Sequence, residues 1–185
     1  MATYFGQQSG DLIDTPSEAV TMWCETAYTC PGSGSQNIQE LSVSCYQVGA
    51  ANIRLGVYNS TGTTLIAEGT SEVAVAANGG APAWQGHMTQ ASVKAAGGSS
   101  PGVLTGGASY RLAISQDAAN NLKYNLLTTG AAGLFSGKFT DYTGGMPSAL
   151  PVPDFQPSDA EPSIRCGVDP ASVGGKPYYA YAQQQ

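Results

Sequence analysis

Two stretches with an apolar side chain at every second position constrain the fold more than any other feature of this sequence. Within Asn52–Asn59 these positions are Ile53, Leu55 and Val57. Within Ser109–Ser115 they are Tyr110, Leu112 and Ile114. Because successive side chains of an extended chain point to opposite sides, each stretch predicts a β-strand with one buried face. The chain is therefore expected to build sheets.

Other short or alternating apolar segments indicate strands on both sides of this pair. They are residues 2–6, 17–26, 40–48, 64–69, 71–76, 84–89, 91–95, 122–128, 134–142 and 163–168. Turn sequences such as Asn59-Ser60-Thr61-Gly62 separate them, since glycine adopts the positive φ angles of tight turns. Many short strands joined by Gly-rich turns predict an all-β fold, a single antiparallel β-sandwich.

Most of this pattern lies in residues 38–168, which are predicted to form the sandwich domain. Residues 1–37 are interpreted as an N-terminal arm that ends in the Gly/Ser-rich break Pro31–Ser35, and residues 169–185 as a C-terminal tail. A length of 185 residues fits one domain with such extensions. The Pro-rich run 146–162 is predicted to be a long surface loop or an extended brace, because proline cannot donate to a sheet ladder.

Charge excludes two classes of partner. The chain has 7 Lys and Arg against 13 Asp and Glu, which gives a net charge of −6. Surfaces that bind phosphate need clustered cations, so we expect neither nucleic acid nor an anionic membrane as a partner. The start of the chain lacks a basic segment followed by an apolar run, which predicts synthesis in a cytoplasm without a cleaved signal.

The four cysteines do not follow the Cys-x-x-Cys spacing of metal sites. Cys45 and Cys166 fall in apolar alternation and are predicted to be small buried hydrophobic residues. Cys24 and Cys30 would close a small loop as a disulfide in an oxidising medium. Free thiols are the favoured alternative for this pair.

An ordered set of motifs extends from Arg54 to Ile114. It consists of Val57-Tyr58, Ser60-Thr61-Gly62, Leu65, Trp84, and then Leu104, Gly107, Tyr110, Leu112 and Ile114. A Pro-rich run with Met146-Pro147 and Pro151–Asp154 precedes the last predicted strand. Over residues 38–168 these motifs resemble a jelly-roll β-sandwich domain found in phage virion proteins (decoration, tail or fibre) and in modular secreted carbohydrate-binding proteins. The resemblance implies a jelly-roll-like fold with N- and C-terminal extensions, and it implies function only loosely.

Catalytic signatures are not found. Gly98–Gly102 matches the pattern G-x-S-x-G, but Pro101 follows Ser100 and has no N–H for an oxyanion hole. His87 is the single histidine, and its position near Trp84 is interpreted as structural. The chain is expected to be no enzyme and to need no cofactor.

Two further motifs have ordinary explanations. Asp117, Asn120 and Asn121 share one turn and offer oxygens to Ca²⁺, but Asp and Asn are common turn formers, so no metal site is predicted. Asn59-Ser60-Thr61 is an N-glycosylation sequence, which has meaning only in a secretory pathway.

Aromatic residues are the candidates for a ligand surface. The residues considered for stacking on a sugar ring are Tyr58, Trp84, Tyr110, Tyr124 and Tyr142. An aromatic face suits the apolar side of a sugar, although alternation places several of these residues on the buried face. Core packing is therefore the competing interpretation.

The terminal segments carry the candidate interface residues. These are Tyr4, Phe5, Tyr178, Tyr179 and Tyr181. Neither segment can build its own core, and Tyr and Phe are favoured at interfaces, so docking on neighbouring subunits is expected, with folding back onto the same sandwich as the alternative. The leading expectation is a non-enzymatic structural protein of a phage virion that contacts other virion proteins and forms homo-oligomers. A carbohydrate-binding or adhesive module is the alternative.

Overall fold

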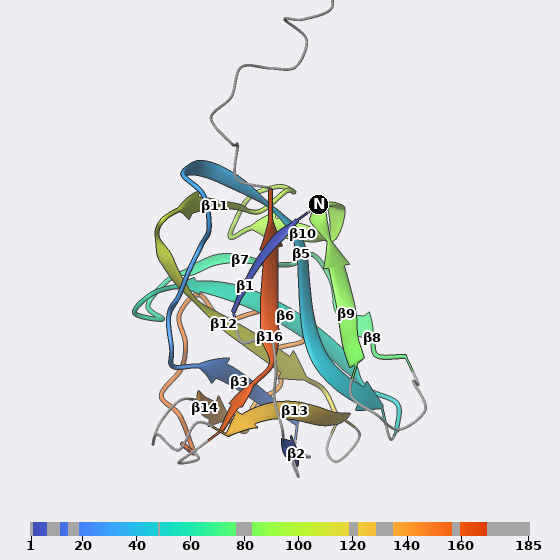
Figure 1. Ribbon diagram of the computed structural model, residues 1–185. Helices are drawn as coiled ribbons and strands as arrows, with labels where there is room; N and C mark the ends of the chain where they lie inside the picture. Colours follow the sequence, from blue (N-terminus) through green and yellow to red (C-terminus); the bar gives the residue numbers. More distant parts are fainter. Residues whose placement is uncertain are drawn as a thin grey trace, which may run out of the picture.

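The computed structural model describes residues 2–6, 12–14, 19–47, 49–76, 83–118, 122–128, 135–156 and 160–169. These residues form sixteen β-strands and one short 3-10 helix, η1 (Gln90–Ser92), and the described part contains no α-helix. The strands make two antiparallel sheets that pack face to face (Figure 1). The predicted all-β antiparallel sandwich is confirmed, and its arrangement is compatible with a jelly roll.

Sheet A is organised along one long strand, β5 (Gly34–Gln47). The strands that pair directly with it are β9 (Ala83–Thr89), β11 (Val103–Gly106), β13 (Leu122–Thr128) and β16 (Ile164–Val168). The strands added outside these are β1 (Thr3–Gly6) on β16, and β2 (Leu12–Asp14) and β15 (Ala160–Pro162) on β13. Sheet A therefore joins both ends of the described chain around β5.

Sheet B is centred on the two alternating stretches. β6 (Asn52–Asn59) and β12 (Ser109–Gln116) pair with Leu55 opposite Ile114 and Val57 opposite Leu112. The other members are β3 (Val20–Cys24), β4 (Tyr28–Thr29), β7 (Leu65–Gly69), β8 (Val73–Ala74), β10 (Val93–Ala95) and β14 (Phe135–Lys138). The two strands with the clearest apolar alternation are thus neighbours at the centre of one sheet.

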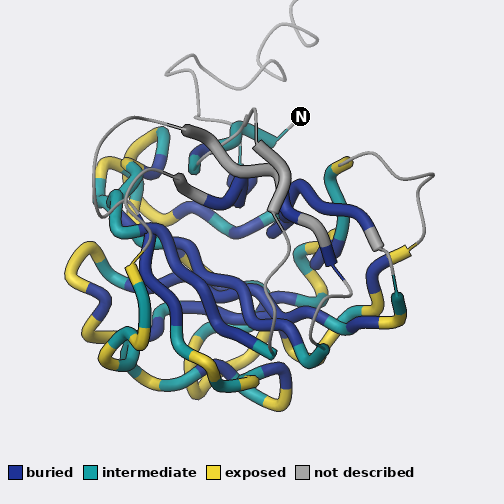
Figure 2. Tube along the Cα trace, turned by 90° about the horizontal axis from the view of Figure 1, so that it is seen from below, coloured by how far each residue is buried: buried dark blue, intermediate teal, exposed yellow. Residues whose placement is uncertain are grey.

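The core fills the space between the sheets. The inward side chains of β6 and β12 are buried. The inward apolar side chains of β5 and β16, which come from the opposite sheet, are buried against them. Burial concentrates in the strands of both layers and exposure in the connecting loops (Figure 2). Each fully buried Leu or Ile side chain contributes about 1.5–3 kcal/mol, so this core supplies the main stabilisation of the fold.

Residues 139–156 cover the outer face of sheet B, and we call them the brace. The backbone N–H of Leu65 donates to Ser148 O at 2.7 Å, and Tyr58 Oη donates to Pro147 O at 2.8 Å. Met146 belongs to the brace, and its side chain joins an apolar cluster whose other buried members lie in sheet B: Trp23, Tyr58, Leu65 and Ala113. β6 is consequently buried on both faces, where alternation predicted one. The Pro-rich run was predicted to be either a long surface loop or an extended brace. Its residues 146–156 form the extended brace.

The predicted boundary between an N-terminal arm and the sandwich needs correction. β5 begins at Gly34 and continues through residues 37 and 38 without interruption. β3, which lies inside the segment 17–26 predicted as a strand, sits between β12 and β14 within sheet B. Residues 1–37 therefore supply strands to both sheets. The strands β2, β4, β11 and β15, of two to four residues each, lie outside the segments predicted as strands.

Candidate functional site

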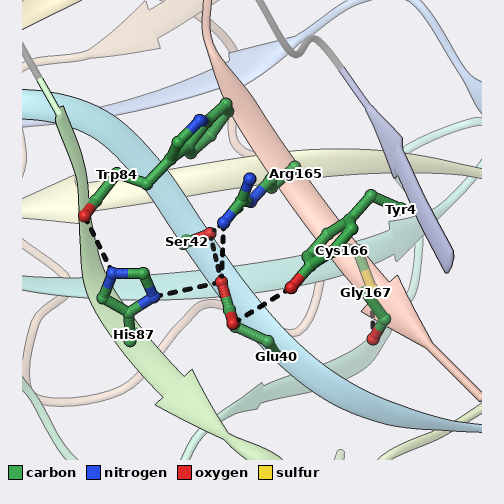
Figure 3. Close-up of polar contacts among 8 residues, drawn as sticks. All are labelled: Tyr4, Glu40, Ser42, Trp84, His87, Arg165, Cys166 and Gly167. Carbon is green, nitrogen blue, oxygen red and sulfur yellow. Dashed lines mark hydrogen bonds and ion pairs between the residues drawn. The ribbon is translucent and has the colours of Figure 1, made fainter. Parts of the chain in front are cut away.

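Six polar and aromatic side chains meet on the outer face of sheet A, and we call them the Glu40 cluster. They are Tyr4 on β1, Glu40 and Ser42 on β5, Trp84 and His87 on β9, and Arg165 on β16 (Figure 3). Their sequence neighbours Phe5, Leu41, Met88 and Cys166 are buried in the core. Alternation along each strand therefore places the cluster on the side of sheet A that faces away from the core.

The guanidinium of Arg165 lies between two aromatic rings. Its Cζ is 4.3 Å from the centroid of the Tyr4 ring and 4.1 Å from that of the Trp84 ring. Each such cation–π contact is worth about 0.5–1 kcal/mol at exposed sites and more where water is excluded. Gly167 makes room for this stack, because a Cβ there would lie 2.8 Å from Cε1 of Tyr4.

Glu40 is the hydrogen-bonding centre of the cluster. Its Oε1 accepts from Ser42 Oγ at 2.8 Å and from Arg165 Nη2 at 3.2 Å, and it lies 3.1 Å from Nδ1 of His87. Oε2 accepts from Tyr4 Oη at 3.2 Å. Burial acts to raise the pKa of Glu40, but the hydrogen bonds from Ser42, His87 and Arg165 outweigh it and hold that pKa below its usual value. The carboxylate is therefore ionised at neutral pH.

The same surroundings shift the pKa of Tyr4 in the opposite direction. Its burial, followed by the nearby charge of Glu40, raises the pKa of Tyr4 above the usual range in spite of the opposing effect of Arg165. The phenol consequently remains protonated and donates to the carboxylate. Tyr4 thereby fastens β1 to β5 across the intervening strand β16.

A β-bulge in β9 brings Trp84 and His87 onto one face. The pairing of β9 with β5 shifts between Leu41–Met88 and Val43–Gln85, and Gly86 has a φ of 63°. Residues three apart in a regular strand point to opposite faces, so His87 reaches the cluster only because of the extra residue. Its Nε2 lies 2.8 Å from the carbonyl oxygen of Trp84, which places the ring against the bulge.

The chemistry of the cluster suits recognition better than catalysis. Ser42 donates its hydroxyl to Glu40, so within the cluster His87 does not activate it as a nucleophile. Glu40 is held by donors that lower its basicity. The side chains of His87, Glu40 and Arg165 remain 49%, 21% and 18% exposed, and Trp84 is partly exposed. The face therefore presents a ring, hydrogen-bond donors and an acceptor to solvent.

The structure does not bring together the five aromatic residues considered for sugar stacking. Tyr58, Tyr110 and Tyr124 are buried, as the core-packing interpretation requires. The Tyr110 hydroxyl accepts from the Thr105 N–H at 2.8 Å, and Tyr124 donates to Gln116 in the interior. Tyr142 packs against the apolar cluster beneath the brace. Trp84 alone of the five belongs to the Glu40 cluster.

The N-terminal interface candidates occupy the molecule's own sheet A. Phe5 is 6% exposed and lies in the core with its ring centroid 6.4 Å from that of Tyr110. Tyr4 is held by Arg165 and Glu40. For these two residues the structure shows the alternative expectation, a strand folded back onto its own sandwich. Tyr178, Tyr179 and Tyr181 lie outside the described residues.

The remaining sequence motifs lie apart from the cluster. Ser100 is exposed in the loop between β10 and β11. Asp117 accepts from the backbone N–H and the side-chain amide of Asn52 at 2.8 and 2.7 Å, which braces a turn, while Asn120 and Asn121 fall outside the described residues. Across the described ranges, no three His, Cys, Asp or Glu side chains are grouped to hold a metal ion.

All four cysteines are free and buried, in agreement with the favoured prediction for Cys24 and Cys30. Burial raises the pKa of Cys30 to about 11 and that of Cys45 to about 12. The thiols therefore remain protonated at neutral pH, and thiolate chemistry is suppressed at these two positions.

Sequence reasoning missed three members of the site. Glu40, Ser42 and Arg165 lie in segments predicted as strands, where alternation already placed them on the outer face. What the sequence lacked was the pairing of strands, since Arg165 and Glu40 are 125 positions apart. A polar residue within an alternating strand was the available signal, and it does not identify its partners.

Comparisons with known proteins add no family to this description. A scan against models of protein families finds no match for the chain, and neither does a search of curated proteins. Within the described residues, no helix has the length and apolar character needed to cross a bilayer. The resemblance to virion and carbohydrate-binding jelly rolls thus depends on the sequence motifs and on a compatible fold.

Proposed function

We propose that this chain is a non-enzymatic structural protein of a phage virion, a capsid decoration or a tail or fibre component, that assembles on neighbouring subunits. One observation carries the proposal, an apolar corner formed at the edge of sheet B by the stacked rings of Phe139 and Phe155, with Val152 three residues before Phe155 in the brace. Phe139 is 48% exposed and Val152 is 82% exposed. Exposed apolar residues that gather in one place mark interaction surfaces more often than scattered ones do.

The apolar corner is held in a fixed shape. The rings of Phe139 and Phe155 stack with centroids 4.9 Å apart, and Phe135 meets Phe155 edge-on at 6.1 Å. The backbone N–H of Gly137 donates to Phe155 O at 3.0 Å, which ties β14 to the end of the brace. A rigid surface loses little conformational entropy on association, so it suits a permanent contact between subunits.

A polar margin lies beside the corner. Lys138 Nζ and Asp154 Oδ1 form an ion pair at 2.7 Å, and the N–H of Phe139 donates to Asp154 at 3.0 Å. Protein interfaces commonly combine an apolar centre with such a polar rim. The acidic, cation-poor composition also favours protein over nucleic acid as the partner. The proposed partners are other virion proteins and copies of this chain, made in the host cytoplasm and carried in the particle.

Sedimentation velocity over a range of protein concentrations tests the assembly role. We expect the wild-type chain to form a defined oligomer, and the double variant Phe139→Ser/Val152→Ser to sediment as a monomer with an unchanged circular dichroism spectrum. Val103→Ser is the matched control, because Val103 is 42% exposed on sheet A and should not affect assembly. A wild-type monomer at every concentration, or equal loss in the control, would contradict the proposal.

A carbohydrate-binding or adhesive module remains the second candidate, and one observation favours it. Trp84 is partly exposed beside the charged groups of the Glu40 cluster, on the other sheet of the sandwich from the apolar corner. The two candidates therefore depend on separate surfaces.

A further inference from the structure

We propose that the Glu40 cluster is a binding site for a neutral saccharide, in which the Trp84 ring contacts the apolar side of a sugar and Glu40 and Arg165 bind its hydroxyl groups. The inference assigns residues to the carbohydrate-binding candidate. It does not depend on the assembly role, because the Glu40 cluster lies on sheet A and the apolar corner at the edge of sheet B.

The side chains are already fixed in position. Arg165 is stacked between two rings, its Nε donates to Ser42 Oγ at 2.9 Å, and its Nη2 donates to Glu40. Both ring nitrogens of His87 have partners within the cluster. All six residues stand on strands of sheet A (Figure 3). A ligand would find its contact groups ordered beforehand, which reduces the entropy lost on binding.

Hydrogen-bonding capacity remains after these internal contacts. A guanidinium has five N–H groups, and the contacts described here engage Nε and Nη2 and leave Nη1 for a ligand oxygen. Oε2 of Glu40 accepts from Tyr4, and a carboxylate oxygen has room for a second donor. A donor and an acceptor on adjoining side chains match neighbouring hydroxyl groups of one sugar, each of which can donate and accept.

Charge and shape favour a neutral ligand. The positive charge of Arg165 is balanced by Glu40 within the cluster, so with a neutral His87 little net charge is left to hold a phosphate or a sulfate. The groups lie on the face of a sheet, and the bulge at Gly86 adds His87 to the same face as Trp84. An aromatic ring beside paired polar groups suits a pyranose, which has one apolar side and a rim of hydroxyl groups.

Affinity electrophoresis of the full chain through gels that contain a neutral glycan tests the site. The probes are soluble starch, hydroxyethyl cellulose, galactomannan, xyloglucan and β-glucan, with polygalacturonate and heparin as anionic comparisons. We expect retardation by at least one neutral glycan, with an affinity reduced at least about tenfold in Trp84→Ala and in Glu40→Gln. Tyr142→Ala is the matched control, because Tyr142 is a partly exposed aromatic residue beside sheet B and its loss should leave retardation unchanged.

Several outcomes would overturn the saccharide site. They are no retardation by any neutral glycan, retardation by the anionic glycans alone, and retardation that Trp84→Ala and Glu40→Gln leave intact. Circular dichroism and thermal unfolding check that each variant is folded. If Trp84→Ala does not fold, Trp84→Phe keeps a ring against Arg165 and should still weaken binding. Phe139→Ser/Val152→Ser should bind glycan as wild type does, so failure of the assembly role and failure of this site are distinguishable.

Discussion

At the scale of single residues, Glu40 links the structure to pH. Its pKa in the folded protein is lowered, so its interactions add stability above the pKa of the unfolded chain and lose that contribution as pH falls through the folded value. We expect Glu40→Gln to unfold more easily than wild type by about 1 kcal/mol at pH 7, and the difference to shrink toward pH 3. Urea unfolding at several pH values measures it. Glu72→Gln, at an exposed position, is the control, and a pH-independent difference for Glu40→Gln would contradict the account.

Gly86 offers a second test at this scale. An alanine there would adopt a left-handed conformation, at about 1–2 kcal/mol, and its Cβ would clash with Cδ1 of buried Ile53. The clash adds about 1–3 kcal/mol of overpacking. Gly97→Ala separates the two effects, because Gly97 has a similar φ of 68° and a Cβ added there would have no neighbour within 4 Å. Gly86→Ala should destabilise the fold more than Gly97→Ala in urea, and equal effects would show that the contact with Ile53 adds no cost.

At the scale of strands, alternation predicted the elements but not everything that covers them. β6 and β12 were predicted from their apolar positions, and they pair in register at the centre of sheet B. Their polar positions gave no sign of burial, yet Arg54 is only 7% exposed because the brace crosses above it. The brace is held by contacts between residues far apart in the sequence, such as Leu65 with Ser148. A pattern with a period of two carries no information about such a third layer.

Glu68 shows how the brace and sheet B depend on each other. Its carboxylate pairs with Arg54 and with Lys94, both at 3.3 Å, and accepts from the Met146 N–H at 2.9 Å. Removing one partner of a buried ion pair leaves an uncompensated charge, so Glu68→Ala should cost about 3–5 kcal/mol in thermal or urea unfolding. Asp154→Asn, which breaks the more exposed pair with Lys138, should cost much less. A similar cost for the two variants would mean that Glu68 does not couple the brace to the sheet.

At the scale of the whole molecule, the sandwich separates two surfaces. The Glu40 cluster lies on the outer face of sheet A, and the apolar corner lies where β14 meets the brace at the edge of sheet B. The fold class was predictable from alternation, because the order of apolar and polar residues within one strand is enough to show which face of that strand is buried. The candidate site was not predictable in this way. Of its residues, only Trp84 and Tyr4 were candidates, Trp84 for sugar stacking and Tyr4 for an interface. Its six residues come from four strands between positions 4 and 165, and only the strand register brings them together.

The proposed function predicts where the protein is found. A structural virion protein remains with purified particles after high-salt washing, whereas an enzyme or a free binding module separates from them. Under this proposal a phage encodes the chain, and peptide mass spectrometry of washed particles of that phage measures the location directly. We expect its peptides at a fixed ratio to those of the major capsid or tail protein, in every preparation. Peptides confined to the soluble lysate, with none in the particles, would contradict the proposal.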